Sequence, residues 1–140
     1  SLELRSEEME VINLRIQKKY KEIEEKEVRY EEYLLEDAEY AIVAFGSAAR
    51  IAKKSIEIAR SQGIKVGLLR PITLWPFPTK EVQKLAGKVK GILSLEINAG
   101  QMVEDIRLAV EGKVPVQHFG RLGGIIPDPD EVVDAIKRLF

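Results

Sequence analysis

The sequence has 140 residues, of which 45% are hydrophobic and 32% are charged, and its formal net charge is −1. This balance fits one globular domain and gives no indication of nucleic-acid or anionic-membrane binding. Because there is no cysteine and only one histidine, disulfides and iron–sulfur clusters ligated by this chain are excluded, and a histidine zinc site is not expected. No apolar run approaches the ~18 residues of a membrane span and no signal peptide is visible, so we expect a soluble, cytoplasmic protein.

Residues 1–30 predict one long helix that carries a narrow apolar stripe. The stripe residues step by 3, 4, 4 and 3 along the chain: Met9, Ile12, Ile16, Tyr20 and Ile23. Such a helix either packs one face on its own domain or forms an arm that reaches another domain or subunit. We therefore divide the chain into an N-terminal amphipathic helix or linker, 1–27, and a folded domain, 28–140. The lack of a strong N-cap on this long helix predicts that the chain was cut from a larger protein.

Residues 40–71 predict a strand, a helix and a second strand. Tyr40–Phe45 is an uncharged run that suits a strand buried on both faces. Gly46 ends it with an expected positive φ, and the Ser47 hydroxyl is expected to cap the helix that follows. The inward face of that helix has helical spacing, and Gly63 is expected just after its C-cap. Lys65–Leu69 returns as a parallel strand through a right-handed crossover.

The remaining elements alternate in the same way. Before the central strand, Val28–Leu35 predicts a short edge strand. After it come a proline-rich loop, Arg70–Pro78, and a helix for which Thr79 is the expected cap. Two further strand–helix pairs follow. The first is Gly91–Ile97 with Met102–Glu111, and the second is Val114–Phe119 with a final helix that begins near Pro127. The inward residues of that final helix are expected to be Val132, Val133, Ile136 and Phe140. Alternation of this kind predicts an α/β, three-layer α/β/α fold with a mostly parallel sheet.

The loops that follow parallel strands lie along one edge of the sheet, where ligands usually bind near the switch in strand order. Helix N-termini after Ser47 and Asn98 would present amides to an anion there. Turn chemistry alone also explains these residues, and no nucleotide-binding glycine motif is present. The candidate strand-end anion or interface site comprises Gly46, Ser47, Arg50, Arg70, Asn98, Gln101 and Arg121.

Several single residues have a structural and a functional interpretation. Arg70 and Arg121 are expected to pair with carboxylates across a subunit contact or with loop carbonyls, rather than with a substrate. Glu96 is a lone carboxylate near a strand end, and His118 lies within a strand, so neither indicates acid–base catalysis. We predict no catalytic, cofactor-binding or metal residues in this chain.

Two aromatic residues fixed among prolines, Trp75 and Phe77, form a candidate docking loop. Large aromatic side chains are costly to expose, so the loop either covers the core of its own domain or contacts a partner.

The strings 36–47, 63–78, 95–102, 120–124 and 127–130 resemble, in order, the C-terminal region of the α subunit of 2-oxoacid:ferredoxin oxidoreductases. The most specific of them is Leu69-Arg-Pro…Leu74-Trp-Pro-Phe-Pro78, and the resemblance covers roughly residues 28–140. In that family this region is similar to the transketolase C-terminal domain, or domain II. The resemblance implies a five-stranded sheet whose first, edge strand is antiparallel.

The resemblance also implies a function. The family converts a 2-oxoacid and coenzyme A to an acyl-CoA, carbon dioxide and reduced ferredoxin, using thiamine diphosphate, Mg²⁺ and iron–sulfur clusters. Those cofactors would bind elsewhere: to an upstream thiamine-pyrimidine domain of the same subunit and to a β or ferredoxin-like subunit. The chain is then a structural, non-catalytic domain, inactive alone, of a homo- or hetero-oligomeric enzyme, with no nucleic-acid or membrane partner.

Two alternatives stay open. A stand-alone small-ligand or nucleotide-binding α/β module would use the strand-end edge of the sheet. An oligomerisation scaffold would use the helix within residues 1–30.

Overall fold

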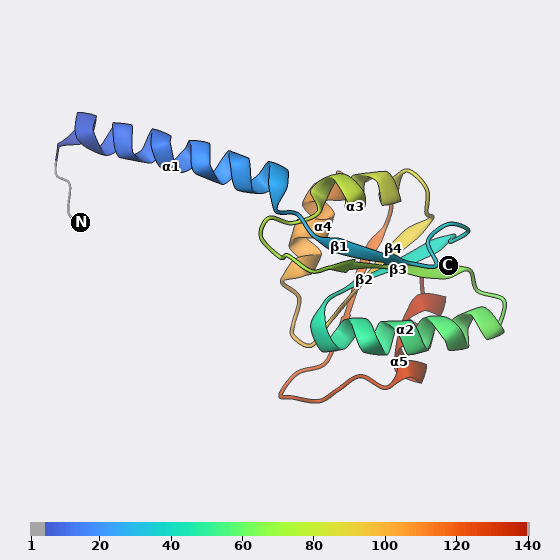
Figure 1. The fold of residues 1–140 in the computed structure, drawn as a ribbon. Coiled ribbons are helices and arrows are strands. Elements are labelled where there is room, and N and C mark those ends of the chain that lie inside the picture. The colour runs from blue at the N-terminus through green and yellow to red at the C-terminus, as the bar shows by residue number, and fades with distance from the viewer. Residues whose placement is uncertain (1–4, 140) are drawn as a thin grey trace.

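A computed structural model describes residues 5–139 of the chain, and Figure 1 shows a twisted sheet with helices on both faces and one helix standing away from it. The helices and strands are, in order, α1 (Ser6–Lys26), β1 (Tyr30–Tyr33), β2 (Tyr40–Ala44), α2 (Gly46–Ser61), β3 (Val66–Pro71), α3 (Thr79–Ala86), β4 (Gly91–Glu96), α4 (Met102–Val110), β5 (Val116–Gly120) and α5 (Pro129–Lys137).

The sheet has five strands in the order β1-β3-β2-β4-β5. β1 pairs antiparallel with β3, and every other pairing is parallel. The central strand is β2, whose Ile42 lies opposite Leu68 on one side and Leu93 on the other. The predicted mostly parallel sheet with an antiparallel edge strand is therefore confirmed.

Two hydrophobic cores fill the space between the sheet and its helices. Successive residues of β2 point to opposite faces, so Ile42 packs in one core and Val43 in the other. The first core contains the inward faces of α2 and α5, and the second those of α3 and α4, which lie on opposite sides of the sheet in Figure 1. The three-layer arrangement is confirmed.

The helix termini confirm some expectations and contradict others. Gly46 has φ +55° and Gly63, just after the C-cap of α2, has φ +84°, as expected. The predicted N-caps are wrong: α2 begins with Gly46 after an N-cap at Phe45, and α3 begins with Thr79 itself after Pro78. Both hydroxyls therefore lie inside the first helical turn and cap nothing.

Helix α1 differs from the rest of the fold because none of its residues is buried. Figure 1 shows it projecting from the domain, with only its C-terminal end near the sheet. The expectation that it packs one face on its own domain is wrong. None of the helices in residues 5–139 is long and apolar enough to cross a membrane. Phe140, predicted to point inward, lies outside the described residues.

Candidate functional site

The carboxyl edge of the parallel strands brings together some of the predicted site residues but not all. Gly46, Ser47 and Asn98 border a hollow of about 250 Å³ between the ends of β2 and β4. This is the switch point, since the chain crosses from one side of β2 to the other on its way from β3 to β4. Glu96, which the sequence indicated only as a lone carboxylate near a strand end, also borders this hollow.

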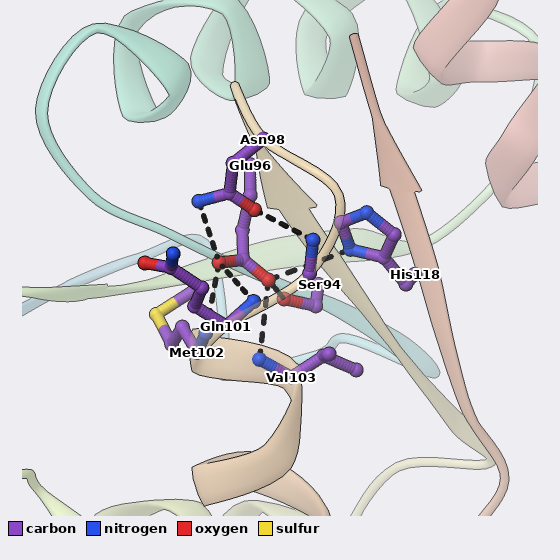
Figure 2. Close-up of polar contacts among 8 residues, drawn as sticks. Ser94, Glu96, Asn98, Gln101, Met102, Val103 and His118 are labelled. Atoms are coloured by element: carbon purple, nitrogen blue, oxygen red, sulfur yellow. Dashed lines mark hydrogen bonds and ion pairs between the residues drawn. The ribbon is translucent and has the colours of Figure 1, made fainter. Parts of the chain in front are cut away.

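Glu96 ends β4, and its side chain turns back beneath the first turn of α4. Its Oε1 accepts hydrogen bonds from the backbone amides of Gln101 (3.1 Å) and Met102 (2.8 Å), and its Oε2 accepts one from the amide of Val103 (3.1 Å). Figure 2 shows the carboxylate at the centre of this set of donors. An internal carboxylate thus occupies the amides that were expected to receive an external anion.

Two side chains complete the hydrogen bonds of this carboxylate. The Ser94 hydroxyl donates to Oε2 at 3.0 Å, and the Asn98 amide Nδ2 donates to Oε1 at 3.2 Å. The carboxylate is completely buried. Burial acts to raise the pKa of Glu96, but the backbone amides of Met102, Gln101 and Val103 and the Ser94 hydroxyl outweigh it, so the pKa lies below its ordinary value. Glu96 is therefore ionised at neutral pH and cannot serve as a proton donor there.

The loop between β4 and α4 is shaped to deliver these amides. The Asn98 Oδ1 accepts a hydrogen bond from the Gly100 amide at 2.7 Å, and Gly100 has φ +108°. On the neighbouring strand, a Cβ at Gly120 would overlap the Asn98 carbonyl oxygen. The loop and β5 approach so closely that only glycine fits at position 120.

His118 on β5 borders the same cluster. Its Nδ1 lies 3.4 Å from the Glu96 Oε2, is buried and makes no hydrogen bond within the described residues, and Figure 2 shows the ring beside the carboxylate. The side chain of His118 is mostly buried in this position. Since Glu96 is already bonded by five donors, the pair has the geometry of a structural contact.

The first turn of α2 lacks such a carboxylate. Ser47 is exposed and makes no capping hydrogen bond. A second small hollow, of about 180 Å³, lies beside Gly46 and is bordered by Arg50, Lys53 and Arg70. Arg50 extends from α2 without a partner among the described residues, and the Lys53 Nζ lies 5.5 Å from the centre of the Tyr33 ring.

The two arginines that were expected at a subunit contact pair within their own chain. Arg70 lies inside β3 and its Nη1 donates to the Glu31 carboxylate on β1 at 2.9 Å. Arg121 donates to the Glu131 carboxylate on α5 at 2.6 Å. The predicted contact across subunits therefore stays a prediction, and Arg121 lies at neither hollow.

The candidate docking loop follows the carboxyl end of β3 and contacts α1 at Tyr20. Phe77 packs against the second core, whereas Trp75 remains 55% exposed. The Trp75 ring meets the Tyr20 ring edge-on with 5.5 Å between centroids. The two aromatic residues therefore divide the roles that were expected of both: Phe77 covers the core and Trp75 faces outward.

The donor set of this chain does not fit the cofactors that the resemblance implies. Iron–sulfur clusters need cysteine thiolates, and the sequence has none. Within residues 5–139, no group of three or more acidic or histidine residues is arranged to hold a metal ion. Glu96 holds the amides that a diphosphate could use at α4. No chemical step can be derived from this chain through any of these groups.

The three-layer fold, with helices on both faces of a mostly parallel sheet, is shared with solved structures. A split-gene transketolase is similar to it with a TM-score of 0.67 and 16% identity, over 78% of this chain and 41% of that one. The chain belongs to the pyruvate:ferredoxin oxidoreductase core domain II family, whose description matches residues 38–132.

Named relatives and solved structures of this chain are oxidoreductases that act on 2-oxoacids. The ketoisovalerate oxidoreductase subunit VorB of Methanothermobacter thermautotrophicus is 45% identical over 139 residues, which are 99% of this chain and 39% of the relative. The 2-oxoglutarate:ferredoxin oxidoreductase of Magnetococcus marinus has the same fold, with a TM-score of 0.83 and 21% identity over 99% of this chain and 24% of that one. The chain thus spans well under half the length of these relatives.

Proposed function

We propose that this chain acts as domain II of the α-type subunit of a 2-oxoacid:ferredoxin oxidoreductase, where its role is structural. The observation that carries the proposal is the buried carboxylate of Glu96. It occupies the amides at the switch point of the sheet, where folds of this kind usually bind a ligand. In this domain the Glu96 carboxylate stabilises the carboxyl edge of the sheet through these amides. The reaction then takes place in other parts of the enzyme.

The reaction of the whole enzyme is, in this proposal, the oxidative decarboxylation of a 2-oxoacid with coenzyme A, giving an acyl-CoA, carbon dioxide and reduced ferredoxin. The Magnetococcus marinus enzyme contains 2-oxoglutarate, coenzyme A and succinyl-CoA, which supports this class of substrate. Ketoisovalerate is the first substrate to test, because the VorB relative shares 45% identity. Thiamine diphosphate supplies the carbanion chemistry and would bind, with Mg²⁺ and the clusters, outside this chain.

The partners in this proposal are a thiamine-pyrimidine domain upstream in the same subunit and a β subunit. We assign residues 1–27 to a connecting helix and 28–140 to the domain itself.

The proposal is tested by exchanging domains. The matching 39% of the Methanothermobacter thermautotrophicus VorB subunit is replaced by this chain, and the other subunits are co-expressed with the hybrid. We expect the hybrid to assemble with them and to reduce ferredoxin with ketoisovalerate. The control hybrid carries Val43→Asp, which places a charge in the second core and should abolish assembly. A folded hybrid that fails to join its partners would contradict the structural role.

The same proposal predicts that these 140 residues alone bind no thiamine diphosphate and have no oxidoreductase activity. Titration calorimetry with thiamine diphosphate and Mg²⁺ measures the first, and ferredoxin reduction the second. Stoichiometric binding of the cofactor by the isolated chain would overturn the proposal.

One observation favours the alternative function, a stand-alone small-ligand or nucleotide-binding module. The first turn of α2 lacks a side-chain cap and lies beside Arg50 and Arg70. Phosphate bound by the isolated chain with micromolar affinity, and lost in Arg50→Ala, would favour this alternative.

A further inference from the structure

Helix α1 presents an apolar face that its own domain contacts only toward the C-terminal end, where Trp75 meets Tyr20. It has 21 residues, none of them buried. A helix of this length in water gains most of its stability from packing against another surface, because helix propensity alone leaves it marginal. A partner for this face would therefore stabilise the helix as well as the complex.

The residues on that face are arranged symmetrically about Ile16. Going outward from Ile16, the steps are 4, 3 and 4 residues in both directions, which keeps every member on one side of the helix. We call this set the α1 stripe: Arg5, Met9, Ile12, Ile16, Tyr20, Ile23 and Glu27. A sequence with this symmetry matches its own reverse, so an antiparallel copy aligns every apolar residue with another.

The charges distinguish the antiparallel arrangement from the parallel one. In an antiparallel pair centred on Ile16, Arg5 of one copy meets Glu27 of the other, and both side chains are largely exposed in the single chain. In a parallel pair, Arg5 would face Arg5 and Glu27 would face Glu27, which is repulsive at both ends. In the single chain Arg5 pairs with Glu8, and Glu27 pairs with Arg29. These ion pairs are exposed and contribute little to stability, so the pairs between copies can replace them.

A second complementary pair lies on the flank of the stripe. Glu8 and Lys26 are 18 residues apart, which is five full helical turns, so they share the same flank. The antiparallel arrangement brings Glu8 of one copy beside Lys26 of the other. Arg15 and Lys19 near the centre oppose the pairing, but their long side chains can extend into solvent.

The C-terminal end of the stripe also continues into a groove. Trp75 packs edge-on against Tyr20, and a groove of about 440 Å³ is bordered by Tyr20, Glu24 and Trp75 together with Gln17 and Lys21. In the antiparallel pair, the first turns of the partner helix reach this end, where Met9 of one copy meets Ile23 of the other. The exposed Trp75 would be covered there.

We propose that the α1 stripe binds the α1 stripe of a second copy of this chain, antiparallel, with Ile16 on the twofold axis. Such an interface is isologous, because both copies use the same surface and each contact, such as that of Met9 with Ile23, occurs twice. This inference is independent of the function proposed above, because it concerns association of the chain and neither cofactor nor substrate.

Cysteine cross-linking tests the geometry, since the natural sequence has no cysteine. Ile16→Cys should form a disulfide-linked dimer with itself in a glutathione buffer. Met9→Cys alone should not, because the two copies of Met9 lie about 21 Å apart along the helix pair. An equal mixture of Met9→Cys and Ile23→Cys should give the mixed dimer. Self-linking of Met9→Cys would show a parallel pair and overturn the proposal.

Light scattering on the 140-residue chain measures whether the dimer forms without a cross-link. We expect the mass of a dimer at protein concentrations up to about 1 mM, the range of weak specific association. Ile16→Lys should give a monomer, whereas Leu14→Lys should remain a dimer. Leu14 is the matched control because it is 64% exposed, off the stripe and on the same helix. A wild-type monomer over the whole range, or an equal effect of both substitutions, would overturn the proposal.

Discussion

Helices α2 and α4 begin at the same edge of the sheet, yet their first turns are satisfied differently. The first turn of α4 receives a buried carboxylate, since Glu96 accepts hydrogen bonds from the amides of Gln101, Met102 and Val103. The first turn of α2 receives no side-chain cap, and it begins at Gly46 with a positive φ. The two helices are equivalent in topology and different in electrostatics.

This difference shows that a helix N-terminus at a switch point is not in itself a ligand site. The amides and dipole of α4 attract negative charge, and the last residue of β4, Glu96, supplies that charge. At α2 no side chain caps the amides, and the neighbouring Arg50 adds further positive charge. The comparison can be tested by changing each first turn separately.

The largest effect is expected from Glu96→Gln. The substitution keeps the size of the side chain but removes its charge and brings an NH₂ group toward donors, so the free energy of unfolding should fall by about 3 kcal/mol. Denaturant unfolding measures it. The control is Glu104→Gln, an exposed change in the same helical turn, which should cost at most about 1 kcal/mol. Equal effects of the two substitutions would mean that burial of the carboxylate does not matter.

A smaller effect is expected from Gly46→Ala at the start of α2. No atom lies within 4 Å of the added methyl group, so only the backbone strain at φ +55° counts. That strain should cost about 1–2 kcal/mol. The matched control is Gly87→Ala, because Gly87 ends α3 with φ −77° and should accept alanine without loss. Thermal or denaturant unfolding of both variants gives the comparison, and a destabilised Gly87→Ala with an unaffected Gly46→Ala would reverse the account.

The smallest effect is expected from Ser47→Ala. Since Ser47 makes no capping hydrogen bond, its loss should change the free energy of unfolding by less than about 0.5 kcal/mol. A true cap serves as the contrast: Asp128 accepts a hydrogen bond from the Asp130 amide at 3.0 Å, and Asp128→Ala should cost about 1 kcal/mol. A larger loss for Ser47→Ala than for Asp128→Ala would show that α2 is capped after all.

Hydrophobic periodicity was sufficient to predict the sheet and its covering helices. The run from Tyr40 to Phe45 contains no charged residue, and the helical spacing after it placed Ala52 and Ile56 inward, where the structure buries them. The number of strands and the antiparallel edge followed from the family resemblance, whereas the order of the strands was not predicted. These features depend on many residues at once, so a shift of one position at an element boundary does not change them.

The helix caps depend on single residues and could not be predicted in the same way. Ser47 and Thr79 are ordinary capping residues by type, but each lies one or more positions inside its helix. The role of Glu96 was missed because an alternating strand does not reveal which way its last side chain turns. The available signal was the order carboxylate, Asn98 and Gly100 before a helix, in which a tight loop returns the chain over the carboxylate.

The most direct test of the account is the pH dependence of stability in the wild type and in Glu96→Gln. The pKa of Glu96 is lowered in the folded state from an ordinary value of 4.5. The unfolded chain therefore takes up a proton first as the pH falls, and the stabilisation is complete above that value and lost as the pH falls through the folded pKa. The shifts of Asp37 and Glu39 are common to both proteins and cancel.

We predict that the difference in free energy of unfolding between the two proteins is constant from neutral pH down to about 5 and then shrinks in more acidic solution. A difference that stays the same at every pH, or that is absent at neutral pH, would contradict the claim that an ionised Glu96 fills the N-terminus of α4.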